Sequence, residues 1–237
     1  GGRACEWVSD RMAGRRFVAY VERNDPQKLW LTARNASATA DVFETAGGAR
    51  RLLASLPVLV GQVVEHVHGW VGKAVEVEAT ADVLLVMVAG GGGDFRALAP
   101  ASSVVLGSTL ALAHISVFGG GSATIVRTCS NSQQTVRTTA LWTLIGSGSS
   151  WGESCRFEAL NGRLLGGSSF SADGAAAWLP PALLSSIVVL PETGSVKLIA
   201  ESAVTCQDGS GGALALAGQN GVHHAVLVSA PPAGTVL

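Results

Sequence analysis

The feature that most constrains the fold of this chain is a recurring pattern of short apolar, β-branched segments separated by glycine-rich turns. The 237 residues include 30 glycines, and charged residues make up only 14 %. Many segments of strand length between turn signals favour an all-β sandwich or barrel. Residues 74–78, Ala-Val-Glu-Val-Glu, alternate strictly, as a half-exposed strand does. The expected strands are 16–22, 29–34, 40–44, 74–78, 82–88, 103–106, 114–118, 124–128, 135–145, 155–160, 185–190, 195–200, 212–217 and 222–228.

One segment has a different periodicity. Residues 47–69 place Leu52, Leu53 and Leu56 at helical spacing, and Pro57 then interrupts the pattern. We therefore expect a short helix in the first half of the chain, followed by a strand or loop.

The size and charge of the chain limit its partners. A chain of this length can bury a sizeable core as one large domain or two small ones. The net charge is −1, and basic residues are adjacent only at 15–16 and 50–51. Phosphate binding needs a concentrated positive surface, so we expect no nucleic acid partner. No apolar run reaches the roughly 18–20 residues that cross a bilayer, so we expect a soluble protein without a membrane span.

The chain shows no targeting segment and begins with two glycines rather than with Met, which indicates a processed or truncated N-terminus. Its compartment stays open. The cysteines are too few for a disulfide scaffold and lack CxxC spacing, so we expect neither a zinc site nor another metal or cofactor. Whether they are free or paired is also left open; they are Cys5, Cys129, Cys155 and Cys206.

The histidines add little to a metal prediction. His114 lies in an apolar segment, where a hydrogen-bonded core histidine is expected. His223 and His224 are adjacent in an expected strand, so their side chains point to opposite faces and cannot converge on one ion.

A serine lies within a glycine-rich turn near the C-terminus, in the run Cys206-Gln-Asp-Gly-Ser-Gly-Gly-Ala213, and apolar segments follow it. Glycines let a backbone fold tightly around the Ser210 hydroxyl and direct N–H groups toward one point. The run resembles the serine loop of chymotrypsin-fold (trypsin-like) serine proteases, in which Gly-x-Ser-Gly-Gly follows a cysteine and precedes a strand–turn–strand. An ordinary Gly-Ser hairpin turn is the alternative.

Two earlier segments are similar to the same family, in the family's order. Residues 17–21 and 29–35 look like the paired strands that lead to the catalytic His. Residues 82–86, Asp-Val-Leu-Leu-Val, look like the strand that opens with the catalytic Asp, although an acid at this place can also cap a turn. The gap from 35 to 82 is near the family's usual spacing. The gap from Asp82 to Ser210 is longer, which loop insertions would explain.

The resemblance implies a fold and a division of the chain. Members of this family are two antiparallel six-stranded β-barrels with the catalytic groups in the cleft between them. We therefore expect an N-terminal barrel at 1–108 and a C-terminal barrel at 109–237 that carries the serine loop.

The chain departs from the family pattern at the catalytic positions. Asn35 stands where the His belongs, and an amide cannot take a proton from a serine hydroxyl. The oxyanion hole would be formed at Asp208 and Ser210, but the family has glycine at the first position, and a carboxylate there would repel developing negative charge. Gly209 replaces the acid that pairs with a new N-terminus in trypsin-type activation. His68 is the alternative base that we consider first.

The resemblance also implies a specificity pocket. Val204 would form its base and Ser229 would lie on the strand that pairs with substrate. An apolar base would suit a small or apolar side chain.

Three functions are compatible with these patterns. The first is a catalytically impaired pseudoprotease that acts by binding or assembly. The second is an active serine endopeptidase with a relocated or altered His, and the third is a structural β-sandwich protein of the viral coat or shell type. A polypeptide substrate or protein partner is expected in each case, and the oligomeric state is left open.

Overall fold

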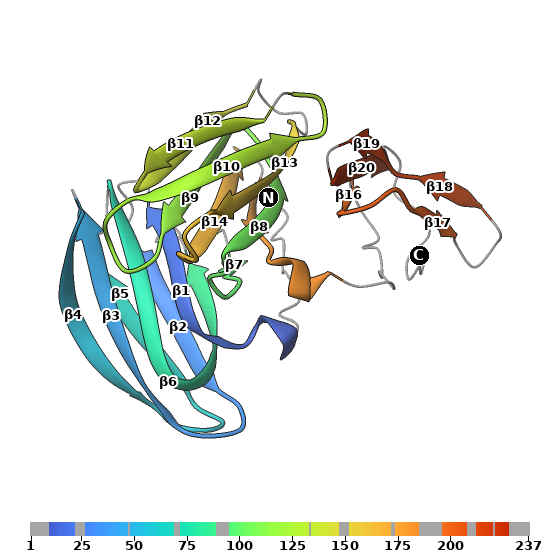
Figure 1. Ribbon diagram of the computed structural model, residues 1–237. Coiled ribbons are helices and arrows are strands. Elements are labelled where there is room, and N and C mark those ends of the chain that lie inside the picture. The colour runs from blue at the N-terminus through green and yellow to red at the C-terminus, as the bar shows by residue number, and fades with distance from the viewer. Residues whose placement is uncertain are drawn as a thin grey trace.

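The computed structural model describes residues 10–21, 27–46, 48–68, 72–88, 95–132, 134–146, 152–171, 174–184, 196–207, 212–219 and 221–227. Over these residues the chain is all-β, which confirms the predicted fold class (Figure 1). The helical segments described are two single 3-10 turns, Asp10–Met12 and Pro181–Leu183. No helix in these ranges is long and apolar enough to cross a membrane.

The first part of the chain forms a large curled sheet with the order β4-β3-β6-β2-β5, and β1 and β7 also pair with β6 (Figure 1). Strand β6 pairs with β1 and β3 along its first half and with β2 and β7 along its second half. Its alternating valines and leucines face a core of aliphatic residues and Phe17. The strands are β1 (Gly14–Val21), β2 (Gln27–Ala33), β3 (Ala38–Ala46), β4 (Ala49–Val58), β5 (Val63–His68), β6 (Lys73–Val88) and β7 (Phe95–Ala97).

The helix predicted within residues 47–69 is wrong, because this segment forms the edge strand β4. The register between β3 and β4 shifts after Val42, so that Leu53 is an extra, unpaired residue in β4. The two adjacent leucines therefore lie at a β-bulge. The Leu52 side chain is exposed, and the Leu53 side chain packs against the core. Pro57 is tolerated because an edge strand has one side without ladder hydrogen bonds.

The middle part of the chain forms a sandwich of two four-stranded sheets, β11-β10-β13-β8 and β12-β9-β14-β15. Phe157 of one sheet packs edge-to-face on Trp142 and Trp178 of the other, with ring centroids 5.3 and 5.4 Å apart. The strands are β8 (Val104–Ser108), β9 (Leu112–Val117), β10 (Ala123–Cys129), β11 (Thr135–Thr139), β12 (Leu141–Ile145), β13 (Ser154–Ala159), β14 (Leu165–Ser171) and β15 (Gly174–Trp178).

A disulfide joins Cys129 of β10 to Cys155 of β13, which are direct partners in the ladder. Cys206 is free and half-buried, and Cys5 lies outside the described residues. The cysteine spacing alone left open whether the cysteines are paired. Disulfides of this kind persist in oxidising compartments.

The last part of the chain forms two small sheets beside the sandwich (Figure 1). One has the order β16-β20-β19 and the other pairs β17 with β18. The strands are β16 (Val196–Ala200), β17 (Thr205–Gln207), β18 (Ala213–Ala215), β19 (Ala217–Gln219) and β20 (Val222–Leu227).

The described sheets have seven, four, four, three and two strands, so two six-stranded barrels are not confirmed. At the predicted division between residues 108 and 109, β8 pairs with β13. The strand that precedes the division thus belongs by hydrogen bonding to the sandwich.

Candidate functional site

The structure places two of the three predicted triad positions near each other. Asn35 is exposed in the bend after β2. Asp82 precedes Val83 of β6, which pairs with Ala33 of β2, so Asn35 and Asp82 lie at the same end of this strand pair. Ser210 lies outside the described residues, as does Asp208.

Asp82 is engaged in a surface ion pair. Its Oδ1 accepts a hydrogen bond of 3.0 Å from Arg15 Nε, and the two side chains are 60 % and 63 % exposed. A guanidinium keeps its proton and cannot act as a general base. Asp82 is therefore paired with a permanently charged side chain here, and not with an imidazole that could take a proton from a serine.

The alternative base is not brought to these two residues. His68 is opposite Gln27 at the start of β2, whereas Asn35 follows the end of β2. At about 3.3 Å per strand residue, roughly 25 Å of β2 separates the two ends.

The predicted specificity-pocket residues do not form a described pocket. Val204 lies exposed just before β17, and its carbonyl accepts a hydrogen bond of 3.0 Å from Leu216 N. Ser229 lies outside the described residues.

A buried carboxylate, Glu76 of β6, joins the large sheet to the sandwich. Its side chain is fully buried, and it is the acceptor of four hydrogen bonds. The donors are Thr45 Oγ1 at 2.8 Å, Arg50 Nε at 2.8 Å, Gly119 N at 3.1 Å and Gly120 N at 3.3 Å. Both glycines have positive φ, 82° and 68°, and successive N–H groups in this conformation form a concave anion site.

Arg50 completes this junction. Its guanidinium lies 3.5 Å from the centroid of the Phe43 ring and 5.2 Å from that of Phe118, and it also donates to Glu78 at 3.1 Å. The charge of Glu76 is thus compensated by a cation that is itself held between two aromatic rings. With its oxygens occupied in this way, Glu76 is a structural residue rather than a proton acceptor for a substrate.

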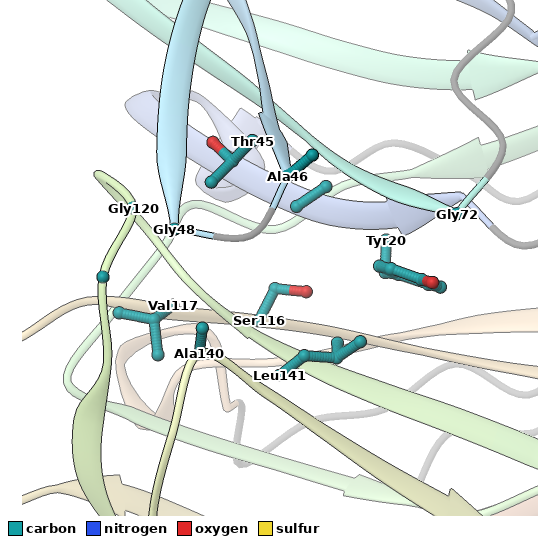
Figure 2. A pocket seen from close by; sticks show the side chains of 12 residues that line it. Tyr20, Thr45, Ala46, Gly48, Gly72, Ser116, Val117, Gly120, Ala140 and Leu141 are labelled. Atoms are coloured by element: carbon teal, nitrogen blue, oxygen red, sulfur yellow. The ribbon is translucent and has the colours of Figure 1, made fainter.

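A cavity of about 150 Å³ lies beside this junction, between the end of the large sheet and the sandwich (Figure 2). Ser116 of β9 is 1 % exposed, and its hydroxyl has no hydrogen-bond partner among the described residues. Among the described residues, no charged side chain belongs to the lining. The lining residues are Tyr20, Thr45, Ala46, Gly48, Gly72, Ala74, Ser116, Val117, Gly120, Gly121, Ala140 and Leu141.

His114 is a core residue, as its apolar surroundings in the sequence predicted. It is 3 % exposed, its Nδ1 lies 3.1 Å from Thr143 Oγ1, and its ring contacts that of Tyr20 with centroids 4.5 Å apart. It holds Tyr20 at the cavity wall.

The two edge strands of the large sheet carry exposed apolar side chains. Among the described residues, β5 pairs only with β2 and β4 only with β3. Val63 and Val67 of β5 are 67 % and 49 % exposed, and Leu59 and Val60 between the two strands are also exposed.

A lysine links the sandwich to the last group of strands. Lys197 Nζ of β16 donates to Ser108 Oγ at 3.0 Å and to the Gly152 carbonyl. Burial lowers the pKa of Lys197 to about 8, and the charge of Glu153 only partly opposes this. Burial, and then the charge of Lys197, also lower the pKa of His224.

Potential metal ligands gather at one place in the described ranges, where Cys129, Glu153 and Cys155 have ligand atoms within 4.8 Å of one another. The two sulfurs are joined in the disulfide, so the site offers no thiolate.

Comparison with protein-family models, with curated proteins and with solved structures found no match for this chain. The functional analysis therefore depends on the geometry. Sequence reasoning missed Glu76, Arg50 and Ser116. The glycines at 119–121 were an available signal, because consecutive glycines permit the positive φ angles that direct N–H groups at an anion.

Proposed function

We propose that this protein is a non-catalytic module that binds an extended polypeptide along the free edge of β5. The observation that carries the proposal is the combination of a strand edge that no other described strand pairs with and the exposed valines Val63 and Val67. Unpaired N–H and C=O groups at a sheet edge are a template for a further strand. Main-chain hydrogen bonds then supply affinity, and the alternate side chains supply specificity.

The side chains of β5 define the sequence that the partner strand needs. Val63, Glu65 and Val67 share the exposed face, and Glu65 accepts hydrogen bonds from Lys28 Nζ at 3.1 Å and Trp30 Nε1 at 2.9 Å. The bond from Trp30, and then that from Lys28, lower the pKa of Glu65 and keep it ionised. A strand with valines opposite the valines and a basic residue opposite Glu65 is complementary in shape and charge.

The catalytic positions support binding rather than cleavage. Asn35 offers an amide and Asp82 is paired with Arg15, so neither provides the general base that serine proteases use. The trypsin-like lineage, with two barrels and Ser210 as the former nucleophile, remains part of the proposal.

Fluorescence anisotropy tests the proposal with a labelled peptide, Val-Thr-Lys-Thr-Val, whose valines and lysine share one face of a strand at the spacing of Val63, Glu65 and Val67. We expect wild-type protein to bind it and Val63→Lys to weaken binding at least about tenfold, because a lysine on the edge opposes strand addition. Val136→Lys is the matched control: Val136 is 58 % exposed on β11, the edge strand of another sheet, where its neighbours are polar. Equal loss in both variants, or no binding by the wild type, would contradict the proposal.

A second measurement separates binding from hydrolysis. We expect the peptide to stay intact by mass spectrometry and a fluorophosphonate to leave Ser210 unlabelled. Cleavage or labelling that Ser210→Ala abolishes would establish the endopeptidase instead. Large assemblies in sedimentation analysis would support the shell-protein alternative.

A further inference from the structure

The cavity between the large sheet and the sandwich contains an unused hydrogen-bonding group. Ser116 Oγ is buried with no partner in the described part of the chain. In Figure 2 its oxygen points from β9 toward the space bounded by Ala46, Tyr20 and Leu141. Buried polar groups are normally hydrogen-bonded, and a buried hydroxyl without a partner makes the folded state less stable. A ligand that reaches Ser116 would supply this bond.

The cavity excludes charged ligands. The lining residues that the structure describes carry no charge, and a buried charge without a partner is costly.

Ser116 Oγ carries the hydrogen bond that the cavity leaves unmade. Thr45 Oγ1 donates its proton to Glu76 at 2.8 Å, and in Figure 2 it points away from Ser116, so it is not used for a ligand here. Ser116 Oγ can donate to, or accept from, one polar atom of a ligand. An uncharged ligand with one hydroxyl matches this capacity.

The size of the cavity limits the ligand to a few heavy atoms. A cavity of similar volume in an engineered protein binds benzene. Glycine and alanine make up most of this lining, so the walls are smooth and largely apolar. A branched aliphatic group is the complementary shape.

We propose that this cavity, separate from the β5 edge, binds an uncharged branched aliphatic group that carries one hydroxyl, held by a hydrogen bond with Ser116. A small free alcohol and the side chain of a threonine in a polypeptide share this chemistry. The site is independent of the β5 edge, so either proposal can fail alone.

The test is an NMR titration of the ¹⁵N-labelled protein with tert-butanol, and with xenon as an apolar probe. We expect tert-butanol to shift the amides of Ser116 and Gly121 with a Kd of about 1–10 mM, as for other ligands of this size. Ser116→Ala should weaken tert-butanol about five- to tenfold and leave xenon binding unchanged, because one hydrogen bond is lost. Ala140→Leu should fill the cavity and abolish the binding of both probes.

Ser168→Ala is the matched control, since Ser168 of β14 is equally buried and equally unpartnered among the described residues but does not line the cavity. The tripeptides Ac-Gly-Thr-Gly-NH2 and Ac-Gly-Val-Gly-NH2 distinguish the two sources. If the threonine peptide binds and the valine peptide does not, the ligand is a polypeptide side chain. If tert-butanol binds and neither peptide does, the ligand is a free alcohol. A cavity that holds water only, or an affinity for tert-butanol that Ser116→Ala leaves unchanged, would overturn the proposal.

Discussion

The sandwich is joined to its two neighbouring groups of strands in opposite ways. On one side it meets the large sheet through Glu76, a fully buried anion with four hydrogen-bond donors. On the other side it meets β16 through Lys197, whose pKa falls to about 8 because burial outweighs its attraction to Glu153. The first charge is compensated where it is buried, and the second is not.

This difference indicates which junction holds at neutral pH. Donors preorganised around Glu76 replace the water that the carboxylate loses on folding. Lys197 has a hydroxyl and a carbonyl as acceptors, and the electrostatic contribution from Glu153 is too small to offset desolvation. We therefore expect the large sheet and the sandwich to unfold together, and the last group of strands to separate first.

The largest effect is expected from Glu76→Gln. The variant removes the fully buried member of the pair and leaves half-buried Arg50 with only the more exposed carboxylate of Glu78. Breaking a buried pair on one side costs about 3–5 kcal/mol. Urea unfolding measures the loss. The control is Glu78→Gln, since Glu78 is half-buried and contacts Arg50 from a more exposed position; it should cost under about 1 kcal/mol. Equal losses would show that the buried junction has no special role.

The next effect is expected from removing the disulfide within the sandwich, between β10 and β13. The double variant Cys129→Ala, Cys155→Ala removes a cross-link between residues 26 apart in the sequence. Chain-entropy arguments predict that the free energy of unfolding falls by about 3 kcal/mol. The free energy of unfolding with and without reductant provides the measurement. Cys206→Ala leaves the cross-link intact and should keep the sensitivity to reductant.

A smaller, pH-dependent effect is expected at the second junction. Between pH 8 and 10.5 the unfolded chain binds a proton at Lys197 that the folded chain does not, so stability rises with pH in this window. Below pH 8 both states are protonated and the folded state bears the full cost of the buried charge. Lys197→Met should remove this rise. Unfolding measured from pH 7 to 10 tests it, with Lys28→Met, on the exposed face of the large sheet, as the control that retains the wild-type slope.

The same contrast explains how far the sequence could predict the molecule. Strand character is a local property, so the alternation at 74–78 predicted part of β6 correctly. The helix failed at Leu52 and Leu53 because a bulge depends on the partner strand. Glu76 alternates like a surface residue, and its partners Gly119 and Gly120 come from a hairpin far along the chain. Ser116 was equally hidden, since a serine in an apolar strand gives no sign of the cavity beside it.

The smallest effect is expected at Asp82, the acid that the trypsin-like resemblance singled out. If its role is the exposed pair with Arg15, Asp82→Asn should cost no more than about 0.5 kcal/mol, and 0.5 M salt should remove even that difference. Unfolding in low and high salt measures this. A catalytic Asp would differ in its effect on labelling: Asp82→Asn would abolish a fluorophosphonate labelling of Ser210 that the wild type shows. Since Asp82 is paired with Arg15 and Asn35 stands where the trypsin-like family has its His, we expect no labelling in either protein. The effect of Asp82→Asn then sets the lower limit against which the effect of Glu76→Gln is compared.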